Sequence, residues 1–130
     1  MTSPDDYLQD VVNVFASITQ SSEFVEEPVI NVPGNEIGIL TFGLEFLDKS
    51  LLFFTATVDL SPGYPAYANY SIHYQDRLGH CIFRYDNAPH YPQLAPFPQH
   101  KHVGKEEHPA NGALPSIRQI ANEIQEILVP

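Results

Sequence analysis

Apolar residues recur at three- and four-residue intervals near both ends of the chain, which is the spacing of one face of an α-helix. Ser3, a residue type that caps helices, precedes the first of these stripes, and Pro4 suits the first helical position. We therefore predict a helix from Pro4 to about Gln20 and a second helix that opens at Pro115 and Ser116. Both stripes are predicted to pack on a core. They comprise Tyr7, Leu8, Val11, Val12, Phe15 and Ile18 in the first helix, and Ile117, Ile120, Ala121, Ile124, Ile127 and Leu128 in the second.

Between the two predicted helices the apolar period changes to two, which is typical of strands with one buried face. The turn residues Asp48 and Lys49 separate two such segments and predict a hairpin, and the turn at 76–79 predicts another. Pro28 lies in an additional strand and favours an edge position, because proline has no N–H for a central ladder. The predicted strands are residues 24–32, 37–47, 52–60, 66–75 and 80–86.

This order of elements predicts an α+β fold: a mostly antiparallel sheet of four or five strands, with an N-terminal and a C-terminal helix packed on one face. A chain of 130 residues, 43% of them hydrophobic, is long enough for one core and too short for two ordinary domains. We expect a single domain, residues 1–130, that contains a Pro-rich, His-containing loop at residues 87–115.

The second hairpin assigns side chains to the two faces of the sheet. With a four-residue loop, Tyr74 is expected to oppose Cys81, and Ser71 is expected to oppose Arg84. The predicted core face carries Tyr70, Ile72, Tyr74, Cys81, Phe83 and Tyr85. The predicted polar face carries Ser71, His73, Gln75, His80, Arg84 and Asp86.

The net charge of −10 disfavours general coating of nucleic acid and binding to anionic membranes, because most of the surface would repel a polyanion. The charge is unevenly distributed. Residues 1–70 hold ten acids and one base, whereas residues 71–130 hold six acids, five bases and all six histidines. The second part of the chain is therefore predicted to bind a phosphate locally. The alternative is an acidic protein in which these residues cluster by chance.

Cys81 is the sole cysteine of the sequence, which excludes an internal disulfide and a Cys-rich zinc site. Its neighbours Ile82 and Phe83 favour a small buried hydrophobe over a nucleophile. The N-terminal segment has no basic region typical of a signal peptide, and no apolar run approaches 18 residues. We expect a cytoplasmic protein without a membrane span.

The segment 83–102 concentrates His90, His100, His102 and several other polar residues between prolines, which predicts an ordered loop. The strings HYQD at 73–76, IFRYDNAPH at 82–90 and FPQHKH at 97–102 resemble the TumE-type toxin family of prokaryotic toxin–antitoxin pairs. The resemblance spans about residues 67–103. It implies a small toxin whose partner is an antitoxin encoded beside it, often a DNA-binding repressor. It implies no particular reaction and no catalytic residues.

The chemistry of the cluster is compatible with cleavage of RNA. Metal-independent cleavage requires a base for the 2′-OH, an acid for the leaving oxygen and a cation for the phosphorane, and histidines, arginine and lysine supply these groups. Asp86 would orient a histidine. The predicted catalytic residues are His73, Arg84, Asp86, His90, His100 and His102, and the predicted substrate-binding residues are Tyr85, Asn87 and Lys101. Tyr85, Tyr91 or Phe97 could stack on an unpaired base. We expect no cofactor.

Three other interpretations stay open. His100 and His102 would point the same way on an extended segment, so with His90 or Asp86 they could bind a metal ion. The cluster could instead dock a basic antitoxin segment without catalysis, assisted by the acidic first half of the chain. The Tyr-Asp-Asn sequence could also serve as a structural corner. A homodimer is a further open possibility.

Overall fold

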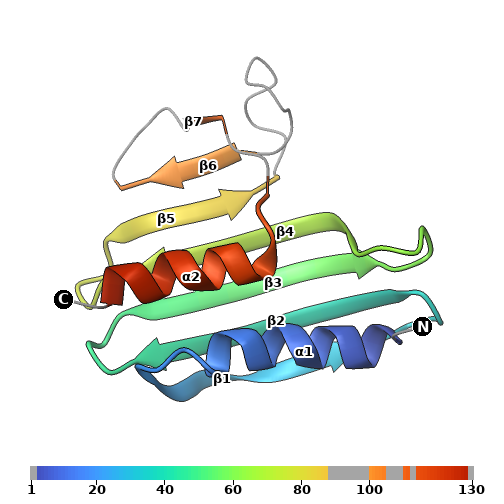
Figure 1. Cartoon of the computed structure of the whole chain (residues 1–130), viewed down its shortest axis with the longest axis horizontal. Helices are drawn as coiled ribbons and strands as arrows, with labels where there is room; N and C mark the ends of the chain where they lie inside the picture. The colour runs from blue at the N-terminus through green and yellow to red at the C-terminus, as the bar shows by residue number, and fades with distance from the viewer. Residues whose placement is uncertain (1–2, 88–99, 105–109, 112–113, 129–130) are drawn as a thin grey trace.

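The computed structural model of the chain describes residues 3–87, 100–104, 110–111 and 114–128. Helices lie at both ends of the described chain, and strands occupy the part between them (Figure 1). The elements are α1 (Pro4–Ala16), β1 (Ser21–Asn31), β2 (Ile37–Phe46), β3 (Leu51–Asp59), β4 (Ala66–Gln75), β5 (Cys81–Asp86), β6 (His100–Val103), β7 (Ala110–Asn111) and α2 (Ile117–Leu128).

The strands form one antiparallel sheet in which each strand pairs with the next one along the sequence (Figure 1). Six of the described strands have four or more residues, and the seventh, β7, has two. The prediction of four or five strands is therefore wrong, although the α+β class and the antiparallel pairing are confirmed. The predicted edge strand is β1, which contains Pro28.

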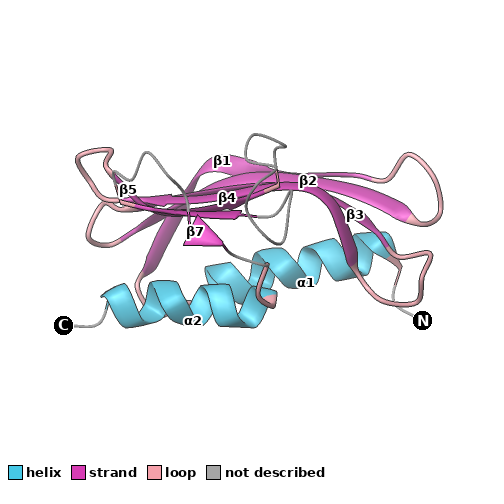
Figure 2. Ribbon diagram, turned by 90° about the horizontal axis from the view of Figure 1, so that it is seen from above, coloured by secondary structure: helices cyan, strands magenta, loops and turns pink. Residues whose placement is uncertain are grey.

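Both helices lie on the same face of the sheet (Figure 2), as the two apolar stripes predicted. Three phenylalanine rings join α1 to the sheet: Phe15 lies 6.0 Å from Phe42 and 5.7 Å from Phe54, measured between ring centroids. Ile120 and Ile124 of α2 are fully buried in the same core. Burial of each such side chain stabilises the fold by roughly 1.5–3 kcal/mol. Because the core lies on the helix-covered face, the uncovered face of the sheet can carry polar residues.

Sequence and cap residues explain where α1 begins and ends. The Asp6 N–H donates to the Ser3 hydroxyl over 3.2 Å, which confirms the predicted N-cap. The helix ends at Ala16 rather than near Gln20, and the Ser17 hydroxyl donates to the carbonyl oxygen of Val14 over 2.8 Å. Ile18 still reaches the core, so the apolar stripe extends past the helix that carries most of it.

The register of the second hairpin differs from the prediction. Ser71 opposes Asp86 and His73 opposes Arg84, each two residues away from the predicted partner. One residue of this shift comes from the pairing of Gln75 with Cys81 instead of His80, and the other comes from the irregularity between Tyr74 and Gln75. An even shift preserves the faces, so the predicted core and polar sets are correct for most positions. Cys81 is the exception.

Cys81 opposes Gln75 instead of Tyr74 and is partly buried. Burial raises the pKa of its thiol, against an opposing effect of the Arg84 charge. The thiol therefore lacks the depressed pKa of a reactive nucleophile.

The predicted loop at residues 87–115 contains the strand β6, which pairs with β5 along its whole length. The prediction of a continuous loop is wrong for His100–Val103. The prolines that predicted a loop flank this strand, and the strand itself contains none, so its N–H groups can pair with β5. Within the described residues, neither helix is long and apolar enough to cross a membrane.

Candidate functional site

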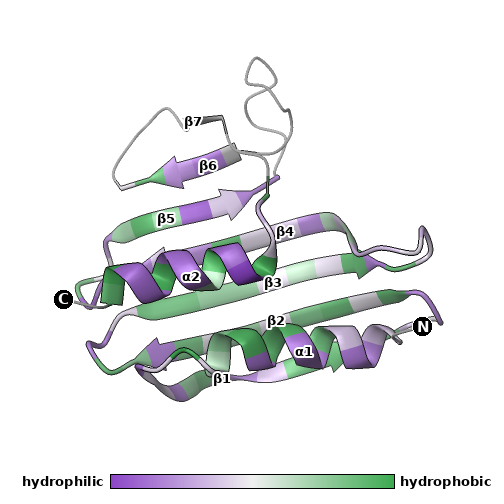
Figure 3. Ribbon diagram, viewed as in Figure 1, coloured by the Kyte–Doolittle hydropathy of each residue, from purple (hydrophilic) through white to green (hydrophobic). Residues whose placement is uncertain are grey.

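The sheet face opposite the helices carries the polar positions of β3 to β6, and three predicted site residues meet there. Arg84 and Asp86 are two residues apart on β5, so they project to the same side of the sheet. The pairing of β5 with β6 places His102 opposite Arg84. Along β5 the hydropathy changes from hydrophobic in the first half of the strand to hydrophilic in the second half, which carries Arg84 and Asp86 (Figure 3).

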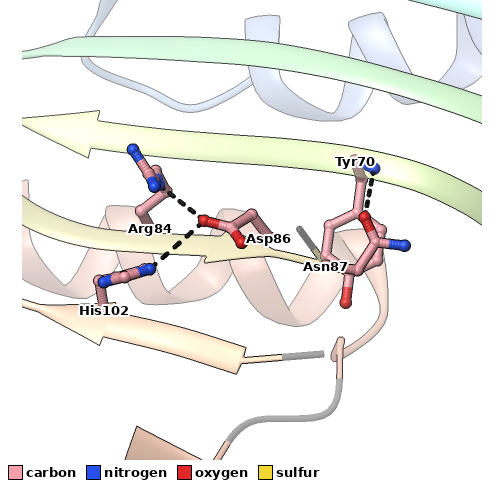
Figure 4. Close-up of polar contacts among 5 residues, drawn as sticks. All are labelled: Tyr70, Arg84, Asp86, Asn87 and His102. Carbon is pink, nitrogen blue, oxygen red and sulfur yellow. Dashed lines mark hydrogen bonds and ion pairs between the residues drawn. The ribbon is translucent and has the colours of Figure 1, made fainter. Parts of the chain in front are cut away.

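Asp86 is a buried carboxylate between two cationic or protonatable groups (Figure 4). Its side chain is 4% exposed, and its Oδ2 atom accepts a hydrogen bond from Arg84 Nε over 2.8 Å. His102 Nε2 lies 3.4 Å from the same oxygen. Because an unpaired buried carboxylate is strongly unfavourable, the contacts with Arg84 and His102 offset part of the cost of burying this side chain.

Arg84 uses only part of its hydrogen-bonding capacity within the described residues. Its one hydrogen bond there is made by Nε, and the side chain is 39% exposed. The two terminal amino groups of the guanidinium therefore remain available for an anion. Guanidinium groups bind phosphate oxygens through two parallel hydrogen bonds, and Asp86 fixes the orientation of this one.

A pocket of about 480 Å³ opens beside this cluster, within the size range of small-ligand sites. Hydroxyl and amide side chains of β3 and β4, together with Asn87 just after β5, form much of its wall. The lining residues are Thr55, Thr57, Asn69, Tyr70, Ser71, Arg84, Asp86 and Asn87.

Asn87 connects the end of β5 to β4. Its Oδ1 accepts from the Tyr70 N–H over 3.1 Å (Figure 4), and its Nδ2 donates to the Ala68 carbonyl over 2.7 Å. Asn87 lines the pocket, as expected of a substrate-binding residue, but its amide holds the pocket wall in place.

Tyr70 contributes a buried phenol near the cluster. Within the described residues, its hydroxyl makes no hydrogen bond. Burial, and then the charge of Asp86, raises the pKa of Tyr70 to about 12. The phenol is therefore protonated at neutral pH and available as a donor.

His73 lies on the other side of Arg84 from His102. It opposes Arg84 in the β4–β5 ladder, and its Nε2 is 3.0 Å from Gln75 Oε1. The sequence His73, Arg84, His102 thus runs across three adjacent strands as one cross-strand row. Two imidazoles flank one guanidinium.

Tyr85 and Lys101, which were predicted to bind substrate, lie on the opposite, helix-covered side. The Tyr85 hydroxyl and Lys101 Nζ each donate to the Glu123 carboxylate of α2 over 2.8 Å. Burial lowers the pKa of Lys101, but the hydrogen bonds and charges of Glu123 and Tyr85 outweigh it, so the pKa is raised. The structure therefore places these two side chains on the other face of the sheet from Arg84, because consecutive positions on a strand alternate between faces, and their role in substrate binding stays a prediction.

For two predicted catalytic histidines, the structure does not describe the side-chain contacts. His90 lies outside the described residues, and His100 opposes Asp86 in the β5–β6 ladder. Among the described residues, no group of three His, Cys, Asp or Glu side chains is arranged to hold a metal ion. The metal interpretation depended on His90 and His100 as well, so it stays untested.

Sequence reasoning placed Ser71 of β4 on the polar face with Arg84 but missed the contribution of β3 and of Asn69 to the pocket. Thr55, Thr57, Asn69 and Ser71 occupy the solvent-side positions that alternate with buried apolar ones. The period-two pattern placed the β3 residues on the uncovered face, but nothing local connected them to Arg84. Only the strand order shows that the polar residues of β3, β4 and β5 lie next to one another on the sheet.

The fold and the site define a class of protein: an antiparallel meander with helices on one face and an Arg–Asp–His cluster beside a polar pocket on the other. The family model described as Toxin TumE matches residues 14–128. The chain therefore belongs to the TumE toxin family. Neither the curated proteins nor the solved structures compared with it gave a match. The family implies the toxin component of a toxin–antitoxin system and suggests an antitoxin partner.

Proposed function

We propose that this protein is the toxin of a toxin–antitoxin pair and that it cleaves RNA by metal-independent acid–base catalysis on its open sheet face. The observation that supports this proposal best is the row His73, Arg84, His102. It places one imidazole on each side of a guanidinium that offers its terminal amino groups to an anion. Neighbouring strands are about 4.8 Å apart, so the two histidines lie roughly 10 Å apart, with the phosphate-binding group between them.

His102 suits the role of base. Its Nε2 lies 3.4 Å from the Asp86 carboxylate, which would hold the ring beside Arg84, and a neutral imidazole carries a lone pair on one of its ring nitrogens. In the reaction, this lone pair takes the proton of a 2′-OH, the 2′ oxygen bonds to phosphorus, and the bond to the 5′ oxygen breaks. A protonated His73 supplies the proton to the leaving oxygen, and Arg84 stabilises the pentacovalent phosphorane.

The test begins with toxicity. Expression of the chain alone should slow bacterial growth, and co-expression of the adjacent gene product should restore it. His73→Ala, Arg84→Ala and His102→Ala should each abolish toxicity, since loss of a general acid or base typically costs 10²–10⁴-fold in rate. His80→Ala is the matched control, because His80 lies at an exposed turn and contacts Asp76.

Cleavage assays with the purified protein distinguish metal-independent from metal-dependent cleavage of RNA. RNA cleavage should persist in EDTA and show a bell-shaped pH profile, since one imidazole must be neutral and the other protonated. Activity that EDTA abolishes and zinc or manganese restores would establish the metal interpretation instead. Normal growth with confirmed soluble expression would exclude the toxin function.

The alternative is that the cluster docks a basic antitoxin segment without catalysis, and the acidic strand β1 supports this second function. This strand is an edge of the sheet, its Val29 side chain is 60% exposed, and Glu23, Glu26 and Glu27 are exposed beside it. Such an edge suits a basic antitoxin segment, with electrostatics raising the association rate more than the affinity. Full toxicity of all three row variants, without RNA cleavage, would favour this second function.

A further inference from the structure

Phe53 is an aromatic side chain on the polar face of β3. The strand buries Leu52 and Phe54 against the helices, so Phe53 projects to the open side, as do Thr55 and Thr57. It is half-buried and opposes His73 in the β3–β4 ladder. The row of the candidate site therefore extends by one strand to Phe53, His73, Arg84 and His102.

A glycine on the neighbouring strand gives the Phe53 ring its room. Gly43 opposes Phe53, and a Cβ atom at Gly43 would lie 3.1 Å from ring atoms Cδ1 and Cε1. The same Cβ would lie 3.1 Å from Val25 Cγ2. The missing side chain thus lets Phe53 lie over the sheet beside Val25.

Phe53 and His73 together form an aromatic shelf next to Arg84. Their ring centroids are 6.5 Å apart, and the ring planes differ by 32°. The shelf is adjacent to the guanidinium of Arg84. Arg84 also lines the pocket, whose other lining residues include hydroxyl and amide side chains. Flat rings, a cation and hydrogen-bonding groups are the recognition elements for base, phosphate and sugar, respectively.

We propose that Phe53 is a stacking platform for an unpaired base of single-stranded RNA, next to the phosphate that Arg84 binds. This inference rests on the proposed function and specifies its substrate. Phe53 lies two strands from Arg84, roughly 10 Å, which suits a base in the nucleotide carrying or adjoining the bound phosphate. A duplex keeps its bases stacked inside and cannot offer one to the shelf. Tyr85, the described aromatic that the sequence suggested for stacking, lies on the covered face beside Glu123.

A purely structural role for Phe53 makes a different prediction. Aromatic rings that cover a glycine on a neighbouring strand stabilise a sheet without binding any ligand. In that case Phe53→Ala would lower the stability and leave the intrinsic affinity of the folded protein for RNA unchanged. Val25 also contacts the space over Gly43, so Val25→Ala removes apolar cover without removing a ring.

The experiment measures binding of a short, unstructured, fluorescently labelled oligonucleotide of 2′-O-methyl RNA. This RNA has no free 2′-OH to attack the phosphate, so the protein cannot cleave it during the titration. Anisotropy titrations compare the wild type with Phe53→Ala, Phe53→Leu, Phe53→Trp and Val25→Ala, each checked for folding by thermal denaturation. Phe53→Ala and Phe53→Leu should weaken binding roughly 5- to 150-fold, as expected for loss of one base–aromatic stack. Phe53→Trp and Val25→Ala should bind like the wild type, and a duplex of the same sequence should bind more weakly.

The outcomes separate this inference from the proposed function. If Phe53→Leu is folded and binds RNA like the wild type, while Arg84→Ala does not bind, the stacking role of Phe53 is wrong and the phosphate-binding role of Arg84 is supported. If the wild type binds no RNA, both fail. If Phe53→Leu weakens binding to the antitoxin and not to RNA, the shelf is a protein-docking surface and the inference is overturned.

Discussion

Replacement of Arg84 by alanine should destabilise the protein more than its exposure alone suggests. The sequence predicts a small effect, below about half a kcal/mol, because surface cations away from packing seldom contribute more. The structure changes that expectation, since Arg84 Nε is bonded to a carboxylate that is 4% exposed. Truncation leaves this carboxylate with fewer partners in a poorly solvated position.

The magnitude lies between two limits. Breaking a fully buried ion pair costs about 3–5 kcal/mol, and an exposed pair contributes about 0–1 kcal/mol. Arg84 is 39% exposed, so water replaces part of its contribution, and His102 remains near Asp86. We therefore expect Arg84→Ala to cost about 1–3 kcal/mol, the range for a charged group that loses one hydrogen bond.

Urea denaturation of the variants measures this cost directly. Arg77→Ala is the matched control, since Arg77 is exposed in the turn between β4 and β5, and it should change the free energy of unfolding by less than about 0.5 kcal/mol. A double-mutant cycle with Asp86→Ala should give a coupling energy of about 1 kcal/mol or more. A cost no larger than that of Arg77→Ala, together with a coupling near zero, would refute the assignment of Arg84 as a stabilising partner of Asp86.

The remaining predictions concern the covered face and the buried phenol. Lys101→Ala should lower the free energy of unfolding by up to about 1 kcal/mol through loss of the Glu123 contact, and leave RNA cleavage unchanged; an inactive but folded variant would contradict the assignment of Lys101 to the covered face. Tyr70→Phe should matter at alkaline pH. The folded-state pKa of Tyr70 is raised to about 12 from an ordinary value of 10.0, so its stabilising contribution is fully present below pH 10 and is lost as the pH rises toward 12. Urea unfolding between pH 8 and pH 11 should therefore show a shallower alkaline decline for Tyr70→Phe than for the wild type, and identical declines would contradict the raised pKa.

Hydrophobic periodicity predicted much of the sheet because it reports burial directly. The alternation through β2 and β3 and the Asp48-Lys49 turn identified their hairpin correctly, since one face of each strand must pack on the helices. The exact pairing of β4 with β5 was not predictable. It depends on an irregularity near Gln75, for which the sequence carries no distinct signal.

The strand β6 was missed for a different reason. It is short, its apolar content is low, and the prolines around it are typical of a loop. Its β-structure depends on pairing with β5, which is a tertiary effect that a local pattern does not contain. The contribution of Phe53 was missed likewise, because the period-two pattern gives its face but only the strand pairing shows that it lies opposite His73.

The alternation rule also explains why only some of the predicted site residues lie together on the open face of the sheet. Arg84 and Asp86 project to the open face, and Tyr85 between them must project to the helices. The same rule applies to β6, where His102 reaches Asp86 and Lys101 reaches Glu123 of α2. A motif read as one reactive cluster therefore divides by position: alternate residues form the candidate site, and the intervening ones attach α2 to the sheet. Substitution of Lys101 should consequently lower the stability without loss of activity, whereas substitution of the neighbouring His102 should abolish the activity.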